Sequence, residues 1–240
     1  MAQLLIQLKE NILFFLVCVG IVAALFFVGR LAEHFLPGMR SVTKVRRLTI
    51  VAICSALAAV LHMLDFPLPF LAPEFYKLDF SELPVMLCGF YLGPSAAVAC
   101  EGLKILLKLL LKGTSTAFVG DFANFAVGCS FVLPAVIIYH IRKTRSSALW
   151  GLLTGTLVLS CFGSAFNAWY LLPKFSQLYD LPLDTIIAMG SKIFPPVRNL
   201  PTFVLLCVAP LNLIKGISVS TLTLLLYKKV ARPLFGLQNK

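Results

Sequence analysis

The sequence predicts an all-α protein that crosses a membrane several times, and three observations carry this prediction. Hydrophobic residues make up 59% of the 240 residues, charged residues make up 13%, and the mean hydropathy is +0.92. Soluble domains are about 45–50% apolar and about 25% charged. The apolar residues form long runs, and the cations flank these runs. A soluble fold, a disordered chain and a secreted disulfide scaffold are therefore excluded.

Seven apolar runs are expected to lie in the membrane, since a spanning helix needs about 20 residues. They cover residues 12–29, 49–64, 83–92, 95–111, 120–140, 148–172 and 201–227. The first run follows Lys9 and has no small-residue cleavage site leading into a soluble domain. We therefore interpret it as a retained helix rather than a signal peptide. A Gly93-Pro94 turn separates the third run from the fourth.

Two connections between the runs are long. Residues 65–84, DFPLPFLAPEFYKLDFSELP, contain four prolines, and four acidic residues accompany the single cation Lys77. This composition predicts a folded, partly inserted loop rather than a helix. Asp79 and Glu82 form an i,i+3 acidic pair, which we expect to be solvated. Residues 173–196 are predicted to be a polar loop.

The charges predict the orientation. Twelve cations and one acid, Glu33, lie in the 30–47 linker, at 142–145 and in the C-terminal tail, whose cations are Lys228, Lys229, Arg232 and Lys240. The intervening connections carry the acidic residues Asp65, Glu74, Asp79, Glu82, Asp180 and Asp184. Because cytoplasmic loops are enriched in Lys and Arg, the C-terminus is expected inside and the N-terminus and acidic loop outside. This pattern also explains the net charge of +11, so nucleic-acid binding is not predicted.

Lys215 is the sharpest polar feature at membrane depth. It lies twelve residues before Tyr227, which places it roughly 18 Å along the helix, too deep for easy snorkelling. Asn212 shares its helix face, and Pro210 is expected to kink the helix. We interpret the pair as part of a binding site; the alternative is a buried ion pair of Lys215 with Glu101 or Asp121.

Asn124 and Asn167 are expected in the outer half of the membrane. Each alone fits either a site or a hydrogen bond between helices, but their convergence with Asn212 and Lys215 favours a pocket. Four charged residues follow one side of the fourth run: Glu101, Lys104, Lys108 and Lys112. We interpret this stripe as structural, with a Glu101–Lys104 pair at i,i+3 and with Lys104 as the first candidate for a binding role.

Ala52, Ala56 and Ala59 follow helical spacing on the second run. Small residues at this spacing allow another helix to approach closely. The pattern leaves open whether the partner helix is internal or belongs to another subunit.

No catalytic or metal-binding pattern is found in the sequence. The histidines, His34, His62 and His140, are isolated, and each of the seven cysteines stands alone in an apolar stretch. HExxH, Walker A and GxSxG patterns are absent, so the chain has no P-loop to bind ATP.

An ordered set of motifs resembles the riboflavin-specific S component of energy-coupling factor (ECF) vitamin transporters. The motifs are KLDFSELP (77–84), Gly93-Pro94, GTST (113–116), GDFANF (120–125), FNAWYLLP (166–173) and PLNLIKG (210–216). The resemblance implies a six-helix membrane subunit that binds riboflavin from outside, without a cofactor or catalytic residues. It also implies three partners, a transmembrane coupling protein and two ATP-binding cassette ATPases, and a place in the bacterial plasma membrane.

The resemblance also implies roles for individual residues. Leu78 and Asp79 belong to a loop that closes over the flavin ring, whose walls we expect from Phe66, Phe70, Phe75, Tyr76 and Phe80. Hydrogen bonds to the ligand are expected from Asn124, Asn167, Asn212 and Lys215. The Ala52-xxx-Ala56 face, with Ala59, resembles the surface that docks on the coupling protein.

Three departures from the family pattern stand out: Asp121 replaces an expected glutamate, Ile105 an expected asparagine, and the 12–29 helix is additional. The chain is thus divided into an extra helix and basic linker (1–45), the six-helix vitamin-binding domain (46–230) and a basic cytoplasmic tail (231–240). Two alternatives stay open. One is an S component for flavin mononucleotide or another vitamin, with Lys77, Lys104 or Lys108 binding a phosphate; the other is a membrane enzyme.

Overall fold

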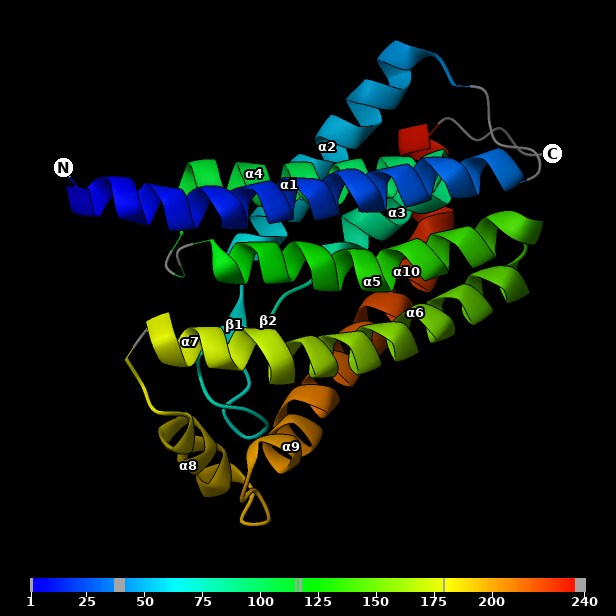
Figure 1. Ribbon diagram of the computed structural model, residues 1–240. Coiled ribbons are helices and arrows are strands. Elements are labelled where there is room, and N and C mark those ends of the chain that lie inside the picture. The colour runs from blue at the N-terminus through cyan, green and yellow to red at the C-terminus, as the bar shows by residue number, and fades with distance from the viewer. Residues whose placement is uncertain (1, 37–41, 115, 117, 179, 236–240) are drawn as a thin grey trace.

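The computed structural model describes residues 2–36, 42–114, 116, 118–178 and 180–235. Arg40 and Lys240 lie outside this part, as do the side chains of Lys228, Lys229 and Arg232. Helices dominate the architecture (Figure 1). They are α1 (Ala2–Phe35), α2 (Lys44–Met63), α3 (Glu82–Leu92), α4 (Pro94–Lys112), α5 (Val119–Arg142), α6 (Arg145–Phe166), α7 (Leu172–Leu178), α8 (Leu183–Ile193), α9 (Leu200–Phe203) and α10 (Ala209–Phe235).

The all-α membrane fold is confirmed. Within the described residues, five helical stretches are long and apolar enough to cross a membrane: Leu16–Phe35, Lys44–Met63, Val119–Arg142, Arg145–Gln177 and Leu200–Tyr227. The third and fourth predicted runs form α3, with 11 residues, and α4, which carries four charged side chains along 19 residues. The count of seven spans stays a prediction.

Two π-helical segments interrupt the long helical stretches Arg145–Gln177 and Leu200–Tyr227. Segment η1 (Asn167–Leu171) joins α6 to α7, and η2 (Val204–Val208) joins α9 to α10. A π-helical turn inserts an extra residue into the helix, and such turns are frequent at functional sites. The irregularity predicted at Pro210 therefore takes the form of a π-helical segment that ends two residues before the proline.

The two long connections differ from each other. Residues 65–81 form a short antiparallel hairpin in which β1 (Phe66–Pro67) pairs with β2 (Lys77–Leu78), so the prediction of a folded loop is confirmed. The prediction of a polar loop at 173–196 is wrong, because this segment includes most of α7 and all of α8. Ile186 of α8 is buried with Phe203 and Leu172 in an apolar cluster. This hydrophobic contact stabilises α8, and the polar residues on either side of the short helix hid it from the hydropathy pattern.

Short α3 lies within the bundle. Ten of its 11 residues are buried, and the largest apolar cluster joins it to α2, α4, α5 and α10. The Gly93-Pro94 turn is confirmed: Gly93 has a φ of 111°, which favours glycine, and Pro94 occupies the first turn of α4.

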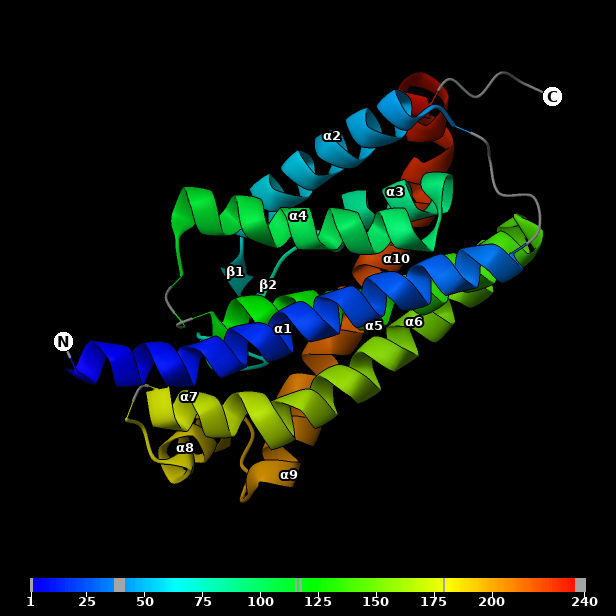
Figure 2. The ribbon, with the colours of Figure 1, turned by 45° about the horizontal axis from the view of Figure 1, so that its top comes forward.

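The additional helix α1 lies along α4 and α5 (Figures 1 and 2). A Cβ atom on Gly29 would lie 3.1 Å from the Ser95 backbone, so α1 and α4 approach closely here. The Glu33 carboxylate accepts hydrogen bonds from the Ser95 backbone N–H (2.9 Å) and hydroxyl (2.7 Å). Arg47 of α2 lies 3.5 Å from the same carboxylate. One carboxylate thus joins three helices.

Helix α1 also accounts for one departure from the family pattern. Ile105 is buried in an apolar cluster with Val98 and Phe125, and Leu25 of α1 packs against this cluster. An isoleucine suits a position that the extra helix covers with apolar side chains.

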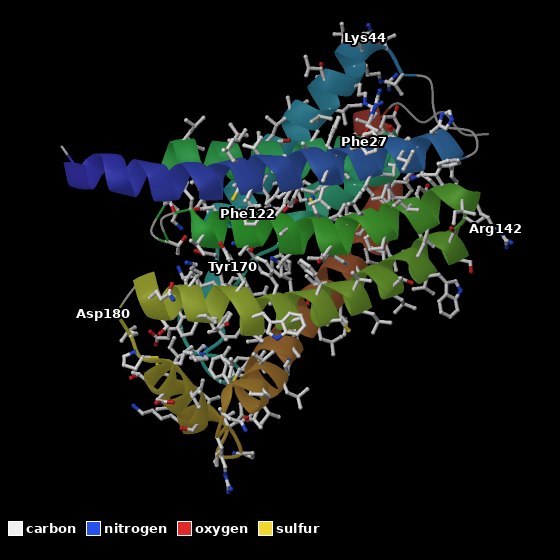
Figure 3. All side chains as sticks on the ribbon, viewed as in Figure 1. Phe27, Lys44, Phe122, Arg142, Tyr170 and Asp180 are labelled. Carbon is white, nitrogen blue, oxygen red and sulfur yellow. The ribbon has the colours of Figure 1, made fainter. Side chains whose placement is uncertain are left out.

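Helix α2 has two environments. Its beginning projects from the bundle, with Lys44 at the tip, and its end lies inside (Figure 3). Ala52 and Ala56 are exposed, whereas Ala59 is only 1% exposed. The prediction that Ala59 belongs to a docking surface is wrong, because Ala59 lies on the side of α2 that faces the chain's own helices, whereas Leu57 and Val60 are 50% and 49% exposed.

Arg142 and Asp180 lie at opposite ends of the bundle (Figure 3). This placement agrees with the predicted separation of basic and acidic connections.

Candidate functional site

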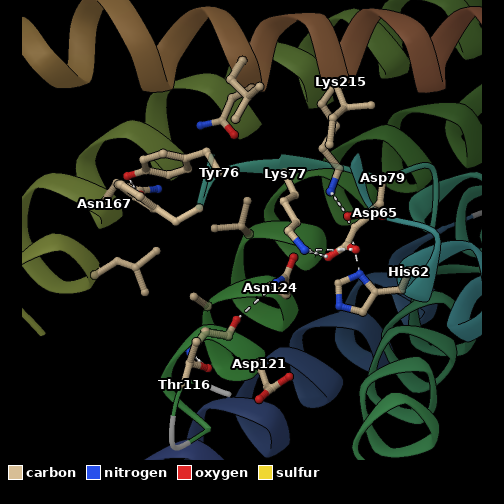
Figure 4. Close-up of a pocket in the computed structure, with 18 of the residues that line it drawn as sticks. His62, Asp65, Tyr76, Lys77, Asp79, Thr116, Asp121, Asn124, Asn167 and Lys215 are labelled. Atoms are coloured by element: carbon tan, nitrogen blue, oxygen red, sulfur yellow. Dashed lines mark hydrogen bonds and ion pairs between the residues drawn. The ribbon is translucent and has the colours of Figure 1, made fainter. Parts of the chain in front are cut away.

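A cavity of about 260 Å³ lies beneath the 65–81 hairpin, between α2, α5, η1 and α10 (Figure 4). All six predicted substrate-binding residues line it: Leu78, Asp79, Asn124, Asn167, Asn212 and Lys215. These residues come from four separate segments of the chain. The sequence-based expectation that their side chains converge on one pocket is therefore confirmed.

Lys215 reaches the cavity from α10. Its ammonium group donates to Asp79 Oδ2 at 3.1 Å and to Glu82 Oε1 at 3.0 Å. The predicted alternative partners, Glu101 and Asp121, are wrong, since the hairpin and α3 supply the carboxylates. An ammonium has three donors, so these two contacts leave one for a ligand.

Asp79 and Glu82 are buried, at 3% and 2% exposed, so the expectation of a solvated pair is wrong. Asp79 accepts a hydrogen bond from the Ser81 backbone N–H at 2.8 Å, and His62 Nδ1 lies 3.4 Å from its other oxygen. Burial opposes ionisation, but the charge of Lys215 and the contact with His62 hold the pKa of Asp79 well below its usual range. Asp79 is therefore a carboxylate at neutral pH.

A further buried ion pair lies next to Glu82, the partner of Lys215. Lys104 is fully buried; it pairs with Glu101 and lies 3.4 Å from Glu82 and 3.1 Å from the Ser81 hydroxyl. The predicted Glu101–Lys104 pair is confirmed. Glu82 thus bridges Lys104 and Lys215, and the alternation of charges stabilises ions that would each be costly to bury alone.

Asn167 occupies the first position of η1. Its Oδ1 accepts a hydrogen bond from the Tyr76 hydroxyl at 2.8 Å, and its Nδ2 donates to the Gly163 carbonyl at 2.7 Å. Burial raises the pKa of Tyr76, so the phenol stays protonated and can donate. The hairpin is thereby attached to η1 beside the cavity, as Figure 4 shows.

The other two carboxamides differ in their partners. Asn124 Nδ2 donates to the Gly120 carbonyl of its own helix at 3.2 Å. Asn212 Nδ2 is buried and has no hydrogen-bond partner among the described residues. A buried amide without a partner costs about 1–3 kcal/mol, which a ligand acceptor would recover.

Fewer of the predicted aromatic side chains line the cavity than the sequence suggests. Of the five predicted aromatic walls, Phe75 and Tyr76 line the cavity. Phe66 and Phe80 pack against each other instead, with ring centroids 6.1 Å apart, and Phe70 is 70% exposed. The hairpin turns these three rings away from the cavity. Phe175 of α7, which the sequence analysis missed, lines it.

His62 is a second residue that sequence reasoning missed. It lies four residues after Ala58 and seven after Ser55, and all three are buried. Residues at this spacing share one face of a helix, so the sequence pattern of α2 could have indicated that His62 faces inward.

The charges of the lining are balanced. It contains three aspartates (Asp65, Asp79, Asp121) and three lysines (Lys77, Lys108, Lys215). Lys77 lies 3.4 Å from Asp65, and Lys108 lies 2.5 Å from Asp121, which also accepts from the Thr114 hydroxyl. Asp121 therefore has a structural partner, and the site as a whole suits an uncharged, polar molecule.

The chain is similar to known proteins over most of its length. Residues 46–227 match the sequence model of the family "ECF transporter, substrate-specific component". The chain belongs to this family. The match begins inside α2, so α1 lies outside it. As an S component, the chain is an integral membrane transport subunit and not an enzyme.

Individual relatives agree with this assignment. The riboflavin transporter RibU of Staphylococcus aureus is 34% identical over 186 residues, covering 78% of this chain and 90% of that protein. The riboflavin transporter FmnP of Bacillus subtilis is 30% identical over 188 residues, covering 78% and 93%. A solved structure described as "Structure and mechanism of the S component of a bacterial ECF transporter" aligns with a TM-score of 0.62 and 34% identity, covering 79% of this S component and 98% of that chain.

Proposed function

We propose that this S component captures riboflavin from the outer side of the membrane and delivers it inside as part of an ATP-driven ECF complex. The observation that carries the proposal is the convergence of three carboxamides and one ammonium on a single cavity. Relatives named as riboflavin transporters align with 78% of this chain. Riboflavin is then the transported ligand, and no resident cofactor is required.

The chemistry of riboflavin fits this lining. Its ring carbonyls and ribityl hydroxyls need hydrogen-bond partners, which Asn124, Asn167, Asn212 and Lys215 supply. Its tricyclic ring needs flat or aliphatic walls, which Phe75, Tyr76 and Leu78 supply. The lining is more polar than that of most small-molecule sites, which suits the many hydrogen-bonding groups of riboflavin.

The hairpin acts as a lid in this proposal. The cavity volume of about 260 Å³ is slightly below the roughly 300–1,000 Å³ of most small-molecule sites. We expect the 65–81 hairpin, including Leu78 and Asp79, to move outward to admit riboflavin and then to close over it. The Tyr76–Asn167 hydrogen bond is one contact that this movement must break.

Flavin mononucleotide is the second candidate, and the charges disfavour it. The three lysines proposed to bind a phosphate all have carboxylate partners: Lys77 with Asp65, Lys108 with Asp121 and Lys104 with Glu101. A phosphate would bring further negative charge close to these carboxylates, which is costly away from bulk water.

Delivery inside requires partners. We propose a transmembrane coupling protein and two ATP-binding cassette ATPases, because the chain has no Walker A sequence of its own. Ala52 and Ala56, on the exposed face of α2, form the proposed docking surface for the coupling protein. Their small side chains are exposed and allow close helix approach.

A binding assay in detergent tests the proposal. We expect riboflavin to quench the tryptophan fluorescence of the purified protein with nanomolar-range affinity, and flavin mononucleotide, thiamine and folate to compete poorly. Asn212→Ala and Asn124→Ala should each weaken binding about five- to tenfold or more, the value of one buried hydrogen bond. Gln177→Ala, on the exposed surface of α7, is the control. Absence of riboflavin binding, or tighter binding of another vitamin, would refute the proposal.

A further inference from the structure

We infer that Gly163 of α6, a buried residue outside the cavity lining, positions two of the carboxamides that hold the ligand. The inference rests on the proposed function, since it concerns how Asn167 and Asn212 are presented to riboflavin. Two independent contacts of Gly163 carry it, one through its carbonyl and one through its missing side chain.

The first contact fixes Asn167. The Gly163 carbonyl accepts a hydrogen bond from Asn167 Nδ2 at 2.7 Å and is also an acceptor for the backbone N–H of Asn167. With Nδ2 held by Gly163, Oδ1 of Asn167 is oriented toward the Tyr76 hydroxyl. The backbone carbonyl at position 163 therefore sets which end of this carboxamide faces the hairpin, and Gly163→Ala keeps this contact.

The second contact fixes Asn212. A Cβ atom on Gly163 would lie 2.7 Å from Asn212 Nδ2 and 3.3 Å from its Cγ. The Asn212 amide thus occupies the space that any other residue at 163 would fill. Because Asn212 Nδ2 has no hydrogen-bond partner among the described residues, this packing is the evident constraint on its position.

The atoms that an alanine at 163 would displace belong to the end of a flexible side chain. Gly155, in the same helix, differs, because a Cβ there would lie 2.6 Å from the Phe131 backbone oxygen. We therefore expect Gly163→Ala to move the Asn212 amide while the helices keep their packing. Alanine also favours a helix over glycine, so the fold should not lose stability.

The test compares three glycine variants in detergent. Gly163→Ala should weaken riboflavin binding about tenfold, the loss of one to two well-placed hydrogen bonds, with an unchanged or higher melting temperature. Gly102→Ala is the matched control, because its Cβ would meet only the Phe125 ring at 3.7 Å, and should bind as the wild type does. Gly155→Ala should lower the melting temperature, as expected for a backbone clash.

A double-mutant cycle with Asn212→Ser separates positioning from a general structural effect. If Gly163 acts through Asn212, the double variant should bind riboflavin about as well as Asn212→Ser alone. Fully additive losses, or wild-type affinity in Gly163→Ala, would overturn the inference. Both outcomes presuppose riboflavin binding by the wild type, so a wild type that does not bind refutes the proposed function instead.

Discussion

Tyr76 is one of the residues through which the hairpin contacts the helices beside the cavity. Its hydroxyl reaches Asn167 across 91 positions of sequence. Because this hydroxyl is a protonated donor, it also fixes the orientation of the Asn167 amide on the hairpin side. One phenol thus links the proposed lid to a carboxamide of the cavity lining.

Tyr76→Phe isolates this contact, since it keeps the ring and removes the hydroxyl. A typical hydrogen bond contributes about 0.5–1.5 kcal/mol, so we expect riboflavin affinity to fall about 2- to 12-fold. The loss should appear mainly as faster dissociation, measured by stopped-flow fluorescence. Tyr170→Phe, on the same π-helical segment but outside the lining, should dissociate at the wild-type rate. Equal rates in both variants would show that the contact does not hold the lid.

Lys215 pairs with buried carboxylates and lines the cavity, so its substitution should affect both stability and the proposed binding. Lys215→Met leaves Asp79 without its ammonium partner, and breaking a buried pair in this way costs about 3–5 kcal/mol. We expect a lower melting temperature together with a large loss of riboflavin affinity.

A second substitution separates the two effects. Lys215→Met combined with Asp79→Asn should recover much of the melting temperature without recovering affinity, since Glu82 keeps its contact with Lys104. If affinity returned with stability, Lys215 would be a purely structural residue.

At the scale of elements, α1 is attached to the core by a specific joint. Glu33 accepts two hydrogen bonds from Ser95 in the first turn of α4 and lies beside Arg47 of α2. A carboxylate at this place satisfies an unpaired N–H and interacts favourably with the helix dipole. The joint lies at the end of the molecule opposite the lid (Figure 2).

Glu33→Ala should therefore lower stability and leave the site intact. Removing a helix cap costs about 0.5–2 kcal/mol, so we expect a measurable drop in the melting temperature in detergent. Riboflavin affinity should not change. Glu74→Ala, in the exposed part of the hairpin, is the control for loss of one acidic side chain. A change in affinity without a change in stability would contradict the purely structural role.

For the whole molecule, the cavity and the proposed docking surface are separate. The cavity lies beneath the hairpin, whereas Ala52 and Ala56 lie on the exposed face of α2. Helix α1 packs on α4 and α5 and therefore leaves this part of α2 open. Binding and docking can consequently be impaired one at a time.

Ala56→Leu is expected to block docking and spare binding. A leucine would prevent close helix approach, so riboflavin uptake by the reconstituted complex should fall strongly. The purified variant should bind riboflavin with wild-type affinity. Ala23→Leu, on the exposed surface of α1, should support normal uptake. Normal uptake by Ala56→Leu would exclude this surface as the docking site.

Hydropathy alone was enough to predict where most helices lie, because a membrane requires long apolar segments. The predicted run 120–140, for example, lies within α5. The same argument failed at 173–196, where α8 is short and amphipathic. It also failed at Ala59, because the spacing of small residues does not show where the exposed face of a helix ends: Ala59 is buried, whereas the next residue, Val60, is 49% exposed.

The membrane class and the polar groups within the apolar runs follow from the sequence, since each such group is costly in a membrane and therefore stands out. Their partners follow from the three-dimensional arrangement: Glu82 for Lys215, Tyr76 for Asn167, and the space beside Gly163 that the Asn212 amide occupies. The two kinds of information differ in range. Burial and periodicity are properties of one segment, whereas these contacts join segments up to 136 positions apart, and their geometry follows from how the helices cross.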